Sequence, residues 1–197
     1  MPLDENARRT RKILWTVLGI NFGFFIVEVL TGWIFQSLGV TADGFDMLVD
    51  AVCQGLSLLA ITRCACFRRY IVNISGTALF ISAAMGLGLV VERLYSPVMP
   101  NYLGMMVISA MAFAGNFISL ALLQKLESKT SNIKAVIICS SKDCLVNLGI
   151  ILSAVLVWLF DSQVPDLVIG AIVFVLVMRG VKEVFELKRE KCPIHDI

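Results

Sequence analysis

Long apolar stretches alternate with short polar connections along the whole chain. Six of these stretches are long enough to cross the roughly 30 Å hydrocarbon core of a bilayer, which takes about 20 residues of α-helix. They lie at residues 13–35, 38–62, 71–92, 102–123, 133–160 and 166–187. The pattern predicts an all-α integral membrane protein with six transmembrane helices.

The polar segments are too short to fold as a separate soluble domain. We expect a basic N-terminal segment at 1–12, a six-span transmembrane domain at 13–187 and a short tail at 188–197. The first apolar stretch is longer than the apolar region of a signal peptide, typically about 7–15 residues, so it is interpreted as a retained span.

Basic residues mark the cytoplasmic side of a membrane protein. Here they cluster before the first span and after the second, fourth and sixth, which is the same side in an even-numbered topology. Both termini are therefore predicted to be cytoplasmic. The clusters are Arg8, Arg9, Arg11 and Lys12; Arg63, Arg68 and Arg69; Lys125, Lys129 and Lys134; and Lys188, Arg189 and Lys191.

Composition narrows the class of protein further. The chain is 58% hydrophobic and 16% charged, with a mean hydropathy of +0.84, whereas soluble domains average about 25% charged residues. The net charge of +2 gives no reason to expect a nucleic-acid partner. The six cysteines lack the spacing of a secreted disulfide framework.

Ionisable residues are nevertheless present inside two of the predicted spans. The second span contains Asp43, Asp46 and Asp50, and the fifth contains Cys139 and Asp143, followed by Asn147. Ionisable groups at this depth are costly and usually functional. Residues four apart share a helix face, so Asp46 pairs with Asp50 and Cys139 with Asp143.

The two pairs are expected at matching depth. At 1.5 Å per residue, the first pair lies about 15 Å from the outer surface and the second about 12 Å from the inner one. Three carboxylates and a thiolate suit a tetrahedral divalent ion such as zinc. Two alternatives stay open: the aspartates could be structural groups bonded to neighbouring helices, and Cys139 could be a small buried hydrophobe.

Several further positions complete a family pattern. They are Asn21, Glu28 and Gly32 in the first span; QSLGVTADGFDMLVD in the second; ERLYSP at 92–97; Asn116 in the fourth; Cys139 and Asp143 in the fifth; and Pro165-Asp166 at the start of the sixth. With these residues the chain resembles the cation diffusion facilitator family. The resemblance implies a homodimeric transporter, not an enzyme, with Asp46, Asp50 and Asp143 at metal positions and Glu28, Asp43 and Asn147 as supporting polar groups.

The chain departs from that family in three ways. The family's cytoplasmic metal-sensing C-terminal domain is missing, so we expect a short member. Cys139 stands where the family has His or Asp. The His-rich loop of eukaryotic zinc-type members is also absent, since His195 is the only histidine.

These residues together predict proton-coupled export of zinc or cadmium from the cytoplasm, across a prokaryotic cytoplasmic (inner) membrane. Four ionised ligands so close together would repel one another, so the metal-free site is expected to hold protons, which metal binding would expel. The thiolate favours the softer ions, while iron, cobalt and manganese are the alternatives. A membrane metal sensor or scaffold that does not transport is the other alternative. An intramembrane zinc hydrolase would be expected to show paired histidines.

Three secondary features carry weaker expectations. Cys64 and Cys66 could capture a soft metal ion, or could be interfacial or lipidated cysteines. Lys142 could neutralise an acid such as Glu28, or extend toward the cytoplasm. Small residues allow helices to approach closely in lipid, so the third span is expected to contribute to the homodimer contact through Gly76, Ala83, Ala84 and Gly88.

Overall fold

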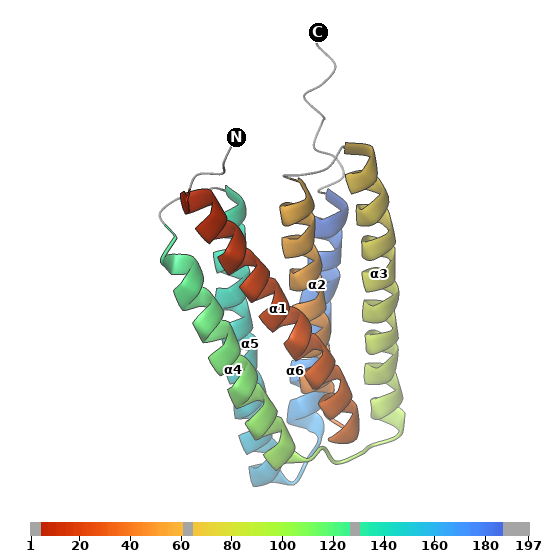
Figure 1. Ribbon diagram of the computed structural model, residues 1–197. Coiled ribbons are helices and arrows are strands. Elements are labelled where there is room, and N and C mark those ends of the chain that lie inside the picture. The colour runs from red at the N-terminus through yellow and green to blue at the C-terminus, as the bar shows by residue number, and fades with distance from the viewer. Residues whose placement is uncertain (1–4, 61–64, 127–130, 187–197) are drawn as a thin grey trace.

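The computed structural model describes residues 5–60, 65–126 and 131–186, and this part of the chain folds into helices alone. Six helices are present in it: α1 (Glu5–Ile34), α2 (Leu38–Ala60), α3 (Ala65–Tyr95), α4 (Tyr102–Gln124), α5 (Ser131–Phe160) and α6 (Val164–Glu186). They run side by side along one direction, with the start of α1 and the end of α6 at the same end of the bundle (Figure 1). The all-α prediction is confirmed.

The helices begin earlier than two of the apolar stretches do. α1 begins at Glu5 rather than residue 13, and α3 begins at Ala65 rather than residue 71. An apolar stretch marks only the part of a helix that lies in lipid, whereas helical backbone bonding continues into the polar residues beside it.

Within the described residues, four helices are long and apolar enough to cross a membrane. These are Arg8–Ile34, Tyr102–Gln124, Ser140–Phe160 and Val164–Lys182. The chain is thus an integral membrane protein, while spans at α2 and α3 and the orientation of the bundle stay predictions.

Helix α2 lies at the centre of the bundle. It is the one helix in the described part that contacts all five others, whereas α3 packs only against α2 and α6 at one edge (Figure 1). Side chains on α2 can therefore meet groups from every other helix, which is where a shared site would need them.

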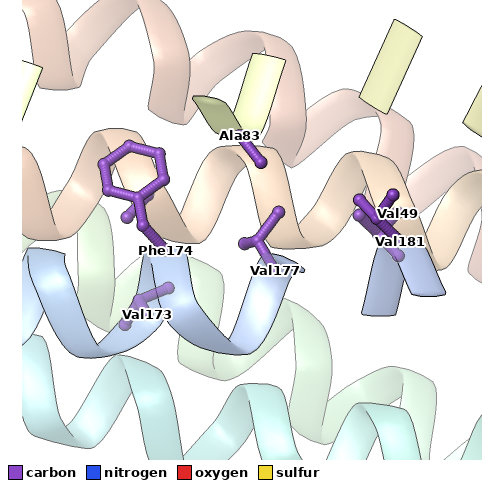
Figure 2. Close-up of a cluster of buried hydrophobic side chains, with 7 residues drawn as sticks. Val49, Ala83, Val173, Phe174, Val177 and Val181 are labelled. Carbon is purple, nitrogen blue, oxygen red and sulfur yellow. The ribbon is translucent and has the colours of Figure 1, made fainter. Parts of the chain in front are cut away.

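An apolar core joins α2, α3 and α6 (Figure 2). Phe174 of α6 is fully buried there, next to Val177 and to Ala83 of α3. A Cβ at Gly86 would lie 1.9 Å from the Phe174 ring, so only glycine lets the ring lie against α3 at this position. Ala83 and Gly86 of α3 thus serve packing within the chain.

This core corrects part of the expected dimer contact. Ala83 and Gly76 are buried within the chain's own bundle, whereas Ala84 and Gly88 are exposed. A Cβ at Gly88 would meet nothing within 4 Å. A period of 3.6 residues puts adjacent positions on different faces, so the four residues could not all serve one outer contact.

The start of α2 is fixed by a carboxylate from α6. Asp166 accepts hydrogen bonds from the Ser37 hydroxyl at 2.7 Å, the Leu38 amide at 2.7 Å and the Gly39 amide at 3.0 Å. The first amides of a helix lack partners within the helix, and side-chain oxygens usually satisfy them. Here the capping oxygens come from a distant helix, so Asp166 sets the position of α2 against α6.

Hydrogen bonds also connect the loops at the other end of the bundle, away from the start of α1 and the end of α6. Gln36 follows α1 and Asp161 follows α5, with positive φ angles of 58° and 46°, the left-handed conformation common just after a helix. The Gln163 side chain accepts from the Val98 amide at 2.8 Å and donates to the Arg93 carbonyl at 3.2 Å. Arg93 also donates to Gln36. These bonds link three connections at this end of the bundle.

Candidate functional site

Polar side chains lie in the buried interior of the bundle, where a soluble helical bundle would have apolar ones. All of the following are 3% exposed or less: Asn21 and Glu28 of α1; Asp43, Asp46, Asp50 and Gln54 of α2; Asn116 of α4; and Asp143 and Asn147 of α5. Helices α1 and α2 pack closely here, because a Cβ at Gly44 would lie only 3.1 Å from the Cβ of Glu28. Burying so many polar groups is costly and calls for a function.

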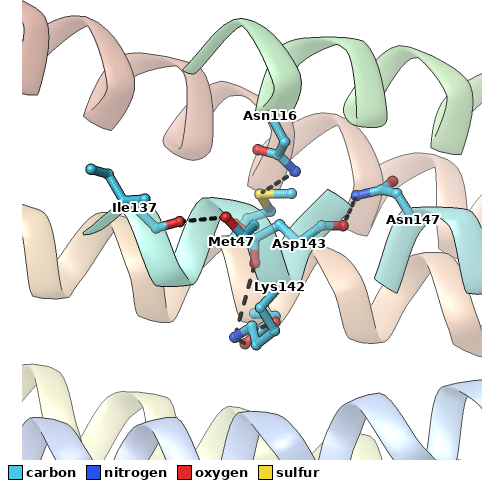
Figure 3. Close-up of polar contacts among 8 residues, drawn as sticks. Met47, Asn116, Ile137, Lys142, Asp143 and Asn147 are labelled. Atoms are coloured by element: carbon cyan, nitrogen blue, oxygen red, sulfur yellow. Dashed lines mark hydrogen bonds and ion pairs between the residues drawn. The ribbon is translucent and has the colours of Figure 1, made fainter. Parts of the chain in front are cut away.

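The predicted meeting of α2 and α5 involves a third charged group. The Nζ atom of Lys142 lies 3.0 Å and 2.8 Å from the two carboxylate oxygens of Asp46. It also lies 3.9 Å from Oδ1 of Asp143 (Figure 3). Asp46 is 1% exposed at its side chain and Lys142 is 34% exposed. One ammonium group therefore lies beside carboxylates from two helices.

The carboxylate of Asp143 has few partners of its own. Neither of its oxygens accepts a hydrogen bond from the described residues, and among these residues its ion-pair partner is Lys142, at the long distance of 3.9 Å. Asn147 donates instead to the Asp143 backbone carbonyl at 3.0 Å. A buried carboxylate with free lone pairs is a suitable ligand for a cation.

Neighbouring groups form a second layer around these acids. Asn116 of α4 donates to the sulfur of Met47 at 3.9 Å. Both oxygens of Glu28 and both of Asp43 lack hydrogen-bond partners among the described residues. The predicted supporting residues Glu28, Asp43 and Asn147 are thus all buried in the bundle, and Asn147 bonds to the α5 backbone.

Not every predicted ligand can be placed. The side chains of Cys139, Cys64 and Cys66 lie outside the described residues. Among the side chains that are described, no three from Asp, Glu, His and Cys are close enough together to hold one metal ion. The four-ligand set of Asp46, Asp50, Cys139 and Asp143 therefore stays a prediction.

The sequence did not predict the contact between Lys142 and Asp46. Lys142 was expected to neutralise an acid such as Glu28 or to extend toward the cytoplasm, but its partner is Asp46. Lys142 is about 100° around α5 from Asp143, and that angle alone would point it away from the aspartates. Its four-carbon stem reaches across that angle, and the matching depth of Asp46 and Asp143 was the signal that could have identified the pair.

The chain is similar to known proteins over different lengths. The family model described as the cation efflux transmembrane domain matches residues 14–65. The zinc transporter ZitB of Escherichia coli (strain K12) is 29% identical over 200 residues, covering 91% of this chain and 60% of that protein. The cadmium, cobalt and zinc/H(+)-K(+) antiporter of Bacillus subtilis (strain 168) is 24% identical over 194 residues, covering 91% of this chain and 62% of that one.

A shorter similarity has a higher identity. Zinc homeostasis factor 1 of Schizosaccharomyces pombe is 48% identical over 59 residues, which are 30% of this chain and 14% of that protein. The chain therefore spans about 60% of the length of the two bacterial relatives.

Proposed function

This chain belongs to the cation efflux family, a family of transporters, and on that premise we propose that it exports divalent transition-metal ions from the cytoplasm in exchange for protons. Zinc and cadmium are the proposed main substrates. The single observation that carries the proposal is the set of buried carboxylates from α2 and α5 that lie beside one cation, the Lys142 ammonium.

The proposed metal site consists of Asp46 and Asp50 of α2 with Asp143 and Cys139 of α5. Carboxylate and thiolate ligands in a tetrahedral set suit zinc, and the thiolate adds preference for softer ions such as cadmium. The burial of Asp46, Asp50 and Asp143 supports this assignment, because buried carboxylates need a compensating cation or proton.

Proton exchange follows from the chemistry of the same ligands. A carboxylic acid or thiol must lose its proton before it binds metal, so metal entry releases protons and metal departure takes them up. No separate proton pathway is required. We further propose that both termini are cytoplasmic, since the exposed Arg8, Arg9, Arg11 and Lys12 lie at the end of the bundle where α6 also ends.

The proposal is tested by flux into proteoliposomes under an imposed pH gradient, with zinc, cadmium, cobalt, iron and manganese offered separately. The wild type should move zinc and cadmium, and each metal ion taken up should be matched by protons leaving. Asp50→Asn and Asp143→Asn should each reduce flux to that of protein-free vesicles, because each removes a charged ligand without changing side-chain size.

Glu92→Gln is the matched control, because Glu92 is exposed on α3 and the same change there should leave flux intact. Wild-type flux in either aspartate variant would disprove the site. Absence of zinc and cadmium flux from the wild type would disprove the transport function.

A further inference from the structure

Lys142 binds the oxygens that the proposed metal ion would need. Its ammonium contacts both oxygens of Asp46, at 2.8 Å and 3.0 Å, from a position 3.9 Å from Asp143. A zinc ion would lie about 2.0–2.2 Å from a carboxylate oxygen. A divalent ion at that distance from Asp46 and the ammonium cannot share the space, and two cations so close together would repel strongly in a low dielectric.

We propose that Lys142 is a tethered cation that occupies the Asp46–Asp143 site and must be displaced each time a metal ion binds. The inference rests on the proposed metal transport and deepens it, because it names a residue that sets the affinity of the same site. The ammonium keeps its charge throughout. Only its position changes, from Asp46 to a place outside the ligand set.

The geometry of Lys142 makes this displacement feasible. Its side chain is 34% exposed, whereas that of Asp46 is 1% exposed, so the lysine has open space beside it and the aspartate does not. A lysine carries a point charge on a flexible stem and binds without the fixed fork of an arginine. It can therefore leave Asp46 by rotating about its own side-chain bonds while the helices stay packed.

A tethered cation also has a use. Burying several carboxylates without a partner is costly, and an ammonium shared between α2 and α5 compensates two of them when the metal has left. Because the competitor is attached to the chain, its effective concentration is high and does not change with that of the metal. Metal affinity is thereby lowered, which favours release on the far side of the membrane.

The test compares metal affinities of detergent-solubilised full-length variants, measured by calorimetric titration with zinc and with cadmium at fixed pH and ionic strength. Lys142→Met keeps the length of the side chain and removes the charge. It should bind both ions about tenfold more tightly or better, since hydrogen bonds to charged groups are worth at least that factor. Lys142→Arg should bind metal more weakly than wild type, because a guanidinium holds a carboxylate through two parallel hydrogen bonds.

The two variants should change metal affinity in opposite directions. If Lys142 only supported the fold, both variants would weaken metal binding. Lys182→Met is the matched control, because Lys182 is exposed on α6, and its affinity should equal that of wild type. If Lys142→Met fails to fold, Lys142→Gln replaces it with the same expectation.

The possible results distinguish the tethered cation from the transport proposal. Metal binding by the wild type with equal or weaker binding by a folded Lys142→Met overturns the tethered cation and leaves the transport proposal standing. Metal binding that appears only in Lys142→Met supports the tethered cation and overturns transport by the wild type. Tighter binding in Lys142→Met together with flux by the wild type supports both.

Discussion

Two adjacent residues of α5 play different parts at the candidate site. Asp143 is fully buried and points a carboxylate with free oxygens into the bundle, while Lys142 reaches from the next position to the Asp46 carboxylate of α2. The sequence identified the aspartates, because charged residues in an apolar stretch stand out. It did not identify the lysine contact, because the reach of a flexible side chain is not set by its helical angle.

Cys139 is the residue whose role most needs a test, because we propose that its thiolate sets the metal preference. If its thiolate binds metal, Cys139→Ser should slow cadmium transport by about tenfold or more and manganese transport much less, since a hydroxyl is a harder and poorer donor. The measurement is a competition series across cadmium, zinc, cobalt, iron and manganese in vesicles. Cys144→Ser, one helical turn plus one residue further on and partly buried, is the control.

A packing role for Cys139 predicts something different. Serine is close to cysteine in size, and its hydroxyl can bond to a carbonyl of the preceding helical turn. An unchanged order of ions with unchanged rates would therefore assign Cys139 to packing. Asp46, Asp50 and Asp143 would then be the protein ligands that remain.

At the scale of helices, the contact between α2 and α6 depends on one carboxylate and one glycine. Asp166 bonds to three donors at the start of α2. One turn further along α6, a Cβ at Gly170 would lie 2.8 Å from the Leu38 carbonyl carbon. Both features keep α2 in the place from which Asp46 meets Lys142 of α5.

Asp166→Asn should lower the stability of the protein. An amide has one acceptor oxygen and one NH₂ group, so a donor would face the amide of Leu38 or Gly39 where an acceptor is now. A buried donor left without a partner costs about 1–3 kcal/mol. Thermal unfolding in detergent, followed by circular dichroism, should show a lower midpoint for this variant.

Asp161→Asn makes the matched comparison, because Asp161 is exposed on the turn between α5 and α6 and asparagine tolerates its positive φ. Its midpoint should equal that of wild type. Equal midpoints for both variants would mean that the Asp166 contacts do not stabilise the start of α2.

The helices were more predictable than the contacts between them. Each predicted apolar stretch lies inside one helix or passes its end by no more than two residues. Bilayer thickness sets the minimum length of a spanning helix, and a run of apolar residues shows that length in the sequence. Which residues of α3 face inward was not predictable in this way. Gly76 and Ala83 turn toward the chain's own core and Ala84 and Gly88 do not, and that division depends on where α6 places Phe174.

At the scale of the whole molecule, the outer surface is apolar, as a lipid-facing surface should be. Large exposed side chains such as Trp33, Met85, Leu145 and Phe160 occur on several helices. These side chains are not covered by other parts of the chain, and exposing so much apolar surface to water would be unfavourable. The buried acids and amides of α1, α2, α4 and α5 lie inside the bundle instead, which reverses the usual arrangement of a soluble bundle.

The last prediction concerns assembly, for which the family resemblance implies a homodimer. In a cysteine-free background, Ala84→Cys should form a disulfide between two copies in lipid, whereas Ala83→Cys should not. Ala84 is exposed, with exposed Gly88 four residues away on the same face, and small residues let two helices approach closely. Ala83 is fully buried against α6, so a thiol there cannot reach a second copy.

The measurement is mild oxidation of the reconstituted variants, followed by electrophoresis without a reducing agent. A dimer band for Ala84→Cys and for Gly88→Cys, with monomer for Ala83→Cys, would assign the contact to the outer face of α3. Monomer for all three, with a monomeric mass for the native protein in lipid, would exclude the homodimer. A dimeric mass without cross-linking would instead move the contact to another helix, because disulfide formation requires the two Cα atoms to lie within about 7 Å.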